Sequence, residues 1–188
     1  MSKAVKIVLG ILLVLLAIPV CAMVSSVHVG SDIDSLREGD IVFQTSESRQ
    51  SPIIALATRS PWTHCGIVVE KNGSLYVLEA SNVVKLTPVK QWVKRGKGGI
   101  FKSKRVIEEP VKIKYSKYLG TAYDMQFKFN NGKYYCSELV YEIYKEQFGI
   151  ELCKPRQVKE YNLSETVLKE MARRGIKGTQ LVVAPCDL

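Results

Sequence analysis

Residues 63–80 read THCGIVVEKNGSLYVLEA, and this stretch carries the main signal for the fold. Two runs rich in strand-forming residues, 65–70 and 74–80, flank the dipeptide Asn72-Gly73. Asn-Gly between such runs is the strongest short-range signal for a β-hairpin, because both residues tolerate positive φ. A two-residue turn also fixes the register, so that Lys71 faces Ser74 and Gly66 faces Glu79. The stretch therefore predicts two antiparallel strands in a defined alignment.

This hairpin places His64 and Glu79 on one face of the predicted sheet. Residues two apart on a strand share a face, so Glu79 is the diagonal neighbour of His64, at roughly 7 Å between backbones. A carboxylate at that distance can hold an imidazole in one tautomer, as general bases require. Gly66 lies between them and is expected to leave open volume, whereas Cys65 points to the opposite face. The alternative is structural: a satisfied histidine beside a solvated glutamate.

Cys136 is the candidate nucleophile. The spacing of apolar residues predicts a helix over 136–148 that ends at Gly149, with Cys136 in its first turn. Unpaired N–H groups and the helix dipole lower the pKa of a thiol there, and the same N–H groups can hold an oxyanion. The alternative is a buried structural thiol, which is the common state of free cysteine. Three further cysteines lack such a helix start and are predicted to be structural, with any disulfide pairing left open: Cys65, Cys153 and Cys186.

Weaker signals complete the predicted α+β organisation. The pattern predicts strands over 41–43, 83–86, 99–107 and 180–184, and helices over 51–57, 112–119 and 162–174. Ser51 is expected to cap the first of these helices, and Gly175 to end the last one. Strands and hairpins precede the longer helices, which favours α+β over alternating βαβ units.

The first 22 residues have the pattern of a secretory signal or a membrane anchor. A basic start precedes an apolar run over 7–18, which Pro19 ends before a small-residue cleavage site at Val20-Cys21-Ala22. An uncleaved anchor is the alternative, because residues 7–24 are just long enough to span a bilayer. In both cases residues 23–188 are predicted to form one domain that acts outside the cytoplasm, in the periplasm or the cell envelope.

The length and composition limit which catalytic groups the chain can form. The 188 residues suit a single domain, and only two histidines, His28 and His64, are present. One plausible histidine ligand argues against a catalytic zinc site, so no metal or cofactor is predicted. A serine-hydrolase elbow is excluded, because the chain has no G-x-S-x-G motif.

The charge distribution indicates which kinds of partner the protein could bind. Lys and Arg exceed Asp and Glu by 27 to 18, and eight basic residues with no acidic one lie between Ala80 and Ile107. Such a stretch favours anionic partners, including a membrane surface, or it is simply a solvated face. The predicted export and the lack of a recognised reader motif argue against nucleic acid.

Several segments, taken in order, resemble the circularly permuted NlpC/p60 proteins, close to their YiiX/YebB-like branch and more distantly similar to the lecithin:retinol acyltransferase type. The resemblance covers about residues 37–165. It rests on GDIVFQ at 39–44, THCGI at 63–67, LEA at 78–80, GTAYD at 120–124 and YCSELV at 135–140.

This resemblance implies a permuted papain-like fold, in which an antiparallel sheet bearing the histidine precedes the helix bearing the cysteine. It implies that Cys136 is the nucleophile, His64 the base and Glu79 the third polar residue. By the same analogy Tyr123 lies near the substrate cleft, and Gln44 is a further candidate for substrate binding.

Two functional hypotheses follow. The first is an exported cysteine hydrolase, in which His64 deprotonates Cys136 and the thiolate attacks an amide or ester to form an acyl-enzyme. Cell-wall peptides are the obvious amide substrates, and lipid or lipoprotein acyl groups, cleaved or transferred, are the alternative. The second hypothesis is a non-catalytic binding module for anionic lipid or wall polymer. Only the hydrolase requires a thiolate near neutral pH.

Overall fold

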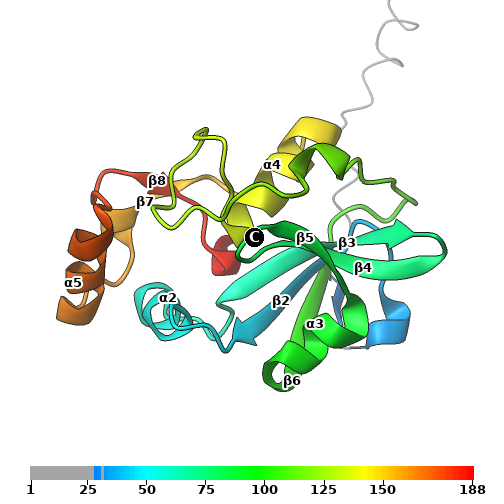
Figure 1. The fold of residues 1–188 in the computed structure, drawn as a ribbon, viewed down its shortest axis with the longest axis horizontal. Coiled ribbons are helices and arrows are strands. Elements are labelled where there is room, and N and C mark those ends of the chain that lie inside the picture. Colours follow the sequence, from blue (N-terminus) through cyan, green and yellow to red (C-terminus); the bar gives the residue numbers. More distant parts are fainter. Residues whose placement is uncertain (1–27, 31) are drawn as a thin grey trace, which may run out of the picture.

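A six-stranded antiparallel sheet forms the centre of the molecule, seen here in a computed structural model that describes residues 28–30 and 32–188. The predicted signal or anchor over 1–22 lies outside the described residues. The strand order is β1-β6-β2-β3-β4-β5. The strands are β1 (His28–Gly30), β2 (Ile41–Ser46), β3 (His64–Lys71), β4 (Ser74–Ala80), β5 (Val84–Pro88) and β6 (Gly96–Arg105). A small second sheet pairs β7 (Arg156–Gln157) with β8 (Leu181–Val182) (Figure 1).

The predicted hairpin is formed by β3 and β4 in the expected register. Lys71 pairs with Ser74 and Ile67 with Leu78. Asn72 and Gly73 have φ values of 53° and 75°, which is the positive-φ conformation that the turn needs. On the other side of β3, strand β2 is paired in antiparallel fashion, and it places Gln44 directly opposite His64.

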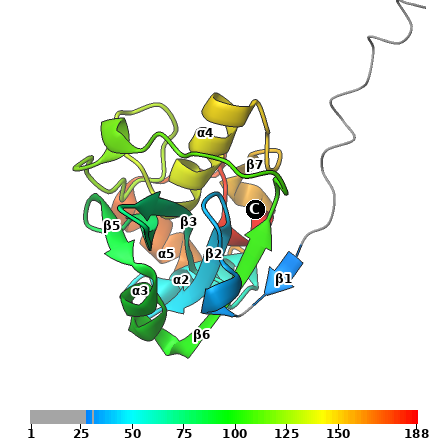
Figure 2. The same cartoon turned by 90° about the vertical axis from the view of Figure 1, so that its right-hand side faces the viewer.

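Helix α4 (Cys136–Phe148) covers one face of this sheet and packs on β3 and β4 (Figures 1 and 2). The helix buries Leu139 and Ile143 against strand residues such as Ile67 and Leu78, all four of them 0 % exposed. Burying an aliphatic side chain of this size contributes roughly 1.5–3 kcal/mol. The helix ends as predicted at Gly149, with φ of 68°. This packing fixes the position of the first turn of α4 relative to the beginning of β3.

A short helix that the sequence pattern did not predict covers part of the opposite face. It is α3 (Val89–Arg95), which connects β5 to β6. Its Trp92 is fully buried in a second apolar cluster with Val42, Val68 and Val77. Figure 2 shows α3 on the side of the sheet away from α4. The two faces of the sheet thus have separate apolar cores.

Two predicted helices differ from the structure. The predicted helix over 112–119 is wrong: only a 3-10 turn, Ser116–Tyr118, is present. Side chains distant in sequence bind the backbone N–H groups there, because Glu38 accepts from Ile113 and Gln147 accepts from Lys114. The predicted helix over 162–174 begins later, as α5 (Glu165–Arg174), because Ser164 caps it by accepting from the N–H of Val167.

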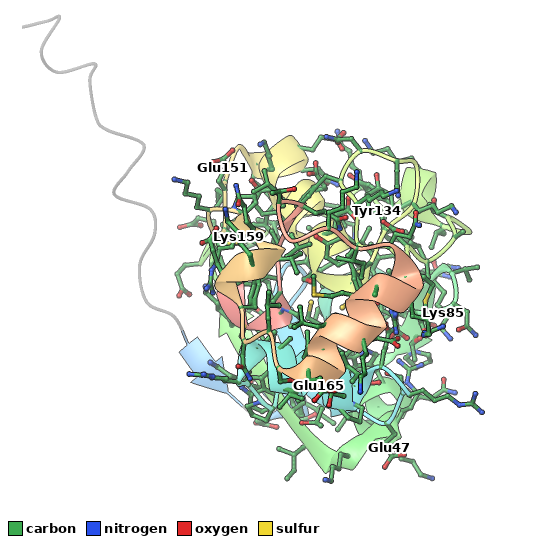
Figure 3. The ribbon with its side chains drawn as sticks, turned by 90° about the vertical axis from the view of Figure 1, so that its left-hand side faces the viewer. Glu47, Lys85, Tyr134, Glu151, Lys159 and Glu165 are labelled. Atoms are coloured by element: carbon green, nitrogen blue, oxygen red, sulfur yellow. The ribbon has the colours of Figure 1, made fainter. Side chains whose placement is uncertain are left out.

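Helix α2 (Ser51–Thr58) packs against α5 beside the sheet. Its N-cap residue is Gln50, not Ser51, whose hydroxyl instead bonds the hydroxyl of Thr63 at 2.6 Å. Figure 3 shows the face that α5 covers, with Glu165 at the beginning of that helix. Within residues 28–30 and 32–188, none of the helices has the length and apolar character that a membrane span requires.

Candidate active site

Glu79 accepts hydrogen bonds from four side chains while being 0 % exposed. Its Oε1 accepts from Thr87 at 2.6 Å and from Arg95 at 2.7 Å. Its Oε2 accepts from His64 Nε2 at 2.6 Å and from Trp92 Nε1 at 3.2 Å. Burial raises the pKa of Glu79, but the bonds from His64, Arg95 and Thr87 outweigh it and lower the pKa to about 2. The carboxylate therefore stays charged and fixed beside the imidazole.

His64 begins β3 and is held on two sides. Its ring stacks on Trp92 with centroids 6.1 Å apart, and its Nε2 is engaged by Glu79. The other ring nitrogen, Nδ1, remains for the hydrogen bond with Cys136. Burial lowers the pKa of His64, but the bonds to Cys136 and Glu79 outweigh it and raise the pKa to about 9. The imidazolium is thus the favoured form at neutral pH.

Cys136 is the first residue of α4 and is 3 % exposed. Cys65 donates to its sulfur from both its thiol and its backbone N–H, and His64 also bonds it. The bond from the Cys65 thiol lowers the pKa of Cys136 most, burial opposes it, and the bond and charge of His64 lower it further. The net result is a pKa well below the ordinary value for a thiol. These pKa directions favour the thiolate of Cys136 and the imidazolium of His64, the charge state in which a cysteine is most reactive.

Cys65 has a contact that its position in the sequence did not reveal. The strand alternation correctly places its side chain on the face opposite Gly66, where α4 packs. On that face it meets Cys136 rather than apolar residues alone. Burial and the bond to Cys136 raise the pKa of Cys65 well above its usual range, so it remains a neutral donor. No disulfide links the cysteines within the described part of the chain.

The other predicted site residues lie in different environments. Tyr123 is half-buried and lines a cavity together with Cys136. Gln44 is 1 % exposed and lies outside that cavity, with its Oε1 in the space that a side chain at Gly96 would take. Its predicted contact with substrate stays a prediction. The open volume expected above Gly66 is absent, because a β-carbon there would meet Val77 Cγ1 at 2.4 Å.

Three side chains that hold Glu79 were missed in the sequence: Thr87, Trp92 and Arg95. One signal was available, because Thr87 is two residues from Lys85, the partner of Glu79 on β5, and therefore shares its face. Trp92 and Arg95 lie on α3, whose presence the pattern did not indicate.

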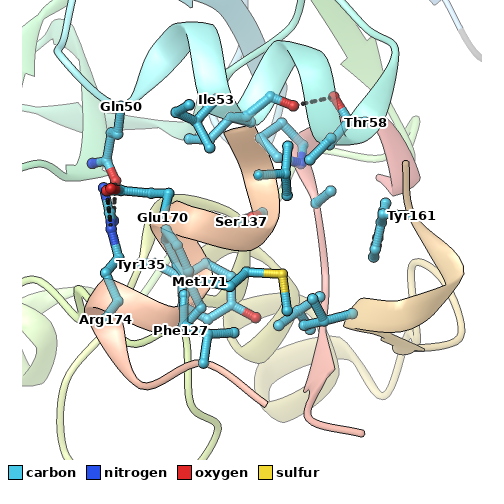
Figure 4. Close-up of a pocket in the computed structure, with 18 of the residues that line it drawn as sticks. Gln50, Ile53, Thr58, Phe127, Tyr135, Ser137, Tyr161, Glu170, Met171 and Arg174 are labelled. Carbon is cyan, nitrogen blue, oxygen red and sulfur yellow. Dashed lines mark hydrogen bonds and ion pairs between the residues drawn. The ribbon is translucent and has the colours of Figure 1, made fainter. Parts of the chain in front are cut away.

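Cys136 lines a mostly apolar cavity of about 120 Å³. Figure 4 shows this cavity with most of its lining residues. Its walls come from α2, α5, the first turn of α4 and the end of the chain. Aliphatic residues dominate the walls, among them Ile53, Ile54, Val167, Met171 and Val183. One end carries a polar group formed by Gln50, Glu170 and Arg174, which Figure 4 shows close together.

Comparison with known proteins identifies the family. A family model described as "Permuted papain-like amidase enzyme, YaeF/YiiX, C92 family" matches residues 35–185. The chain belongs to this family. The fold is accordingly the permuted papain-like fold predicted above, and the family assignment makes the chain a cysteine hydrolase of the amidase type. The wider NlpC/p60 grouping stays a prediction.

Two relatives are similar over most of the chain. The uncharacterized protein YiiX of Escherichia coli K12 is 37 % identical over an alignment of 158 positions, and the match covers 78 % of this chain and 78 % of that protein. A crystal structure titled metalloprotein yiiX, from Escherichia coli O157:H7, is 35 % identical with a TM-score of 0.74, and the match covers 80 % of this chain and 90 % of that one. In residues 28–30 and 32–188 of the present chain, no group of three or more His, Cys, Asp or Glu side chains is placed to hold a metal.

Proposed function

We propose that this protein hydrolyses an amide or ester through an acyl-enzyme on Cys136. The thiolate attacks the carbonyl carbon, and the His64 imidazolium then gives its proton to the leaving nitrogen or oxygen. Neutral His64 next takes a proton from water, whose oxygen attacks the acyl carbon. The acid leaves, and the thiolate–imidazolium pair is restored.

One observation carries this proposal: a buried carboxylate holds His64 by Nε2 at 2.6 Å while the same ring bonds the sulfur of Cys136. A binding module has no need for this arrangement, because burying the Glu79 carboxylate beside His64 brings a desolvation cost with no benefit to packing. The backbone N–H of Cys136 at the start of α4 and the hydroxyl of Tyr123 are the donors we assign to the oxyanion.

The polarity of the cavity walls favours one class of substrate over the other. Apart from the polar group formed by Gln50, Glu170 and Arg174, these walls are mostly apolar, and a polar wall peptide would leave most of its amide groups without partners there. An aliphatic acyl chain fits these walls instead. We therefore favour lipid or lipoprotein acyl groups, which the sequence left as the alternative, over cell-wall peptides. The scissile carbonyl then lies at Cys136 and the chain extends between α2 and α5.

The proposal is tested with esters and amides of increasing acyl length, from acetyl to palmitoyl. We expect kcat/KM to rise with chain length and to vanish in Cys136→Ala. Cys186→Ser is the matched control, because Cys186 is exposed and outside the cavity. Turnover that persists in Cys136→Ala, or no turnover of any member of the series, would refute a hydrolase centred on this cysteine and leave the binding module.

The acyl-chain assignment has its own matched pair of variants on α2. Ala57 lines the cavity, whereas Ala55 on the same helix does not, and both are half-buried. Ala57→Leu adds three carbons to the cavity wall and should lower kcat/KM for long-chain esters while sparing acetyl esters. Ala55→Leu should do neither. Equal losses for short and long esters in Ala57→Leu would contradict the assignment.

Location and membrane contact are part of the same proposal. The basic run between residues 80 and 107 supplies exposed lysines on and next to α3, among them Lys90, Lys94 and Lys97. We propose export through residues 1–22 and contact of this face with an anionic membrane surface. Sedimentation with vesicles of anionic and of zwitterionic lipid tests the contact, and equal binding to both would contradict it.

A further inference from the structure

A chain of hydrogen bonds connects α5 with Tyr123 at the end of the cavity. It begins with Glu170, whose Oε1 accepts from Arg174 Nε at 2.6 Å. Arg174 Nη1 then donates to Gln50 Oε1 at 3.1 Å. Gln50 and Tyr123 line the same cavity, where a hydrogen bond from Gln50 lowers the pKa of the Tyr123 hydroxyl. Figure 4 shows the Gln50, Glu170 and Arg174 end of this chain, with its bonds dashed.

The direction of each bond follows from the chemistry of the groups. Arg174 is always a donor, so the part of the Gln50 amide that faces it must be the carbonyl oxygen. The NH2 group of the same amide is then left to donate to the Tyr123 oxygen. A phenol oxygen that accepts a bond there can still give its own proton, and that proton must point elsewhere.

The proton of Tyr123 is available because the phenol stays neutral. Burial and the nearby Cys136 thiolate raise the pKa of Tyr123 well above its usual range. Tyr123 and Cys136 line the same cavity, where the carbonyl of a substrate would lie. A neutral O–H directed into that space is a suitable donor to an oxyanion.

The outer part of this chain of hydrogen bonds, at Arg174, is buried and makes several contacts. The side chain of Arg174 is 8 % exposed, and its guanidinium lies over the ring of Phe127 at 5.6 Å. Gly175 ends α5 immediately after it, with φ of 68° and its N–H bonded to the last turn. Arg173, by contrast, shares Glu170 as partner but is 66 % exposed and has no bond to Gln50.

We propose that Gln50 and Arg174 are positioning residues, which orient the Tyr123 hydroxyl so that its proton points to the oxyanion formed at Cys136. The inference rests on the proposed acyl-enzyme. Arg174 fixes the orientation of the Gln50 amide, and Gln50 fixes the orientation of the phenol. The alternative is that these residues only connect α2 to α5 and stabilise the fold. The two explanations predict different acylation rates for one substitution.

That substitution is Gln50→Glu. The carboxylate keeps the contact with Arg174 and strengthens the tie between the helices, but it has no N–H to donate. It instead accepts the proton of Tyr123 and turns it away from Cys136. We expect acylation to slow by about 100-fold, the loss typical of one oxyanion donor. The structural alternative predicts wild-type rates and an unchanged or higher melting temperature.

The experiment measures acylation of Cys136 by a nitrophenyl ester of an aliphatic acid in a stopped-flow double-mutant cycle. Tyr123→Phe should lose about as much as Gln50→Glu, and the combination no more than either, because both remove the same donor. Arg174→Met should give a smaller loss and Arg173→Met none. Losses that multiply in the double variant, or a Gln50→Glu enzyme as fast as wild type, would overturn the inference.

Alkylation by iodoacetamide separates this outcome from failure of the proposed function. Alkylation needs the thiolate but no oxyanion donor, so all these variants should react at the wild-type rate. An activated ester acylates a reactive thiolate even in a protein that is not a hydrolase, so the coupling can be measured in either case. Failure of the proposed function would show separately, as an acyl-enzyme that water does not release.

Discussion

Replacing Glu79 with Gln tests how the carboxylate acts on His64. Glutamine has nearly the same shape but offers one oxygen in place of two, and it carries no charge. Donors on both sides of the carboxylate, such as Thr87 and Trp92, then compete for a single acceptor. Arg95 loses its charge partner at the same time. His64, whose side chain is only 12 % exposed, also loses its charge partner, and breaking a buried ion pair of this kind costs about 3 kcal/mol or more, so a lower melting temperature is expected.

The larger consequence concerns pH. The pKa of His64 lies at about 9 in the folded protein, against an ordinary value of 6.5. In the proposed mechanism the imidazolium is the acid that protonates the leaving group, so we expect activity to fall as pH rises through this pKa. If the pKa returned fully to its ordinary value, the protonated fraction at pH 8 would fall about 30-fold, but at pH 6 by less than about twofold. Cys136 also supports the imidazolium, so 30-fold is the upper limit.

The assay is kcat/KM for ester hydrolysis between pH 5 and pH 10, with circular dichroism to verify folding. We expect the alkaline limb of Glu79→Gln to move to lower pH while activity near pH 6 is nearly retained. Thr87→Val is the matched control, because it removes a neutral donor to the same carboxylate and leaves the charge in place. The same fold loss at every pH would refute the reasoning and reduce Glu79 to a packing role.

Three further predictions concern the surroundings of this group. Arg95→Gln should lower the free energy of unfolding by about 1–2 kcal/mol, because the lost bonds are to a charged group but Arg95 is half-exposed. Lys94→Gln on the same helix is the control and should leave the free energy of unfolding unchanged. Chemical denaturation measures both. Cys65→Ala removes a hydrogen-bond donor to Cys136 and should slow the alkylation of Cys136 at acidic pH. Cys65→Ser keeps a donor and should restore the rate. Mass spectrometry follows the label, and equal alkylation rates in the two variants would contradict this role. Gly66→Ala places a β-carbon 2.8 Å from the carbonyl oxygen of Leu78 on the next strand, and it should lower the free energy of unfolding by about 1–3 kcal/mol. Gly178→Ala makes only an ordinary 3.5 Å contact and should have a much smaller effect. The midpoint of thermal unfolding distinguishes the two variants.

The hairpin shows what local sequence information can deliver. Asn72-Gly73 determines the turn, the turn determines the register, and the register alone brings Glu79 within reach of His64. The position of Cys136 at the start of a helix was likewise predictable, because its apolar spacing and the Gly149 stop are both local signals.

Contacts between distant segments were beyond such reasoning. Helix α3 is short and begins after Pro88 without a side-chain cap, so neither spacing nor capping indicated that Arg95 would reach Glu79. Strand alternation placed Cys65 correctly on the face away from His64, but only the packing of α4 shows that this face leads to Cys136. The cavity depends on the contact between α2 and α5, which no local pattern encodes.

The chain order of the site has a consequence for biosynthesis. His64 and Glu79 are translated well before Cys136, and they can form their hairpin by a short-range closure. Cys136 gains its low pKa only when α4 packs on β3. This contact joins segments far apart in the sequence, so its loop-closure entropy cost is higher than that of the hairpin. Until that step Cys136 has the reactivity of an ordinary thiol. The chain order thus places the step that lowers the pKa of Cys136 after synthesis of most of the domain.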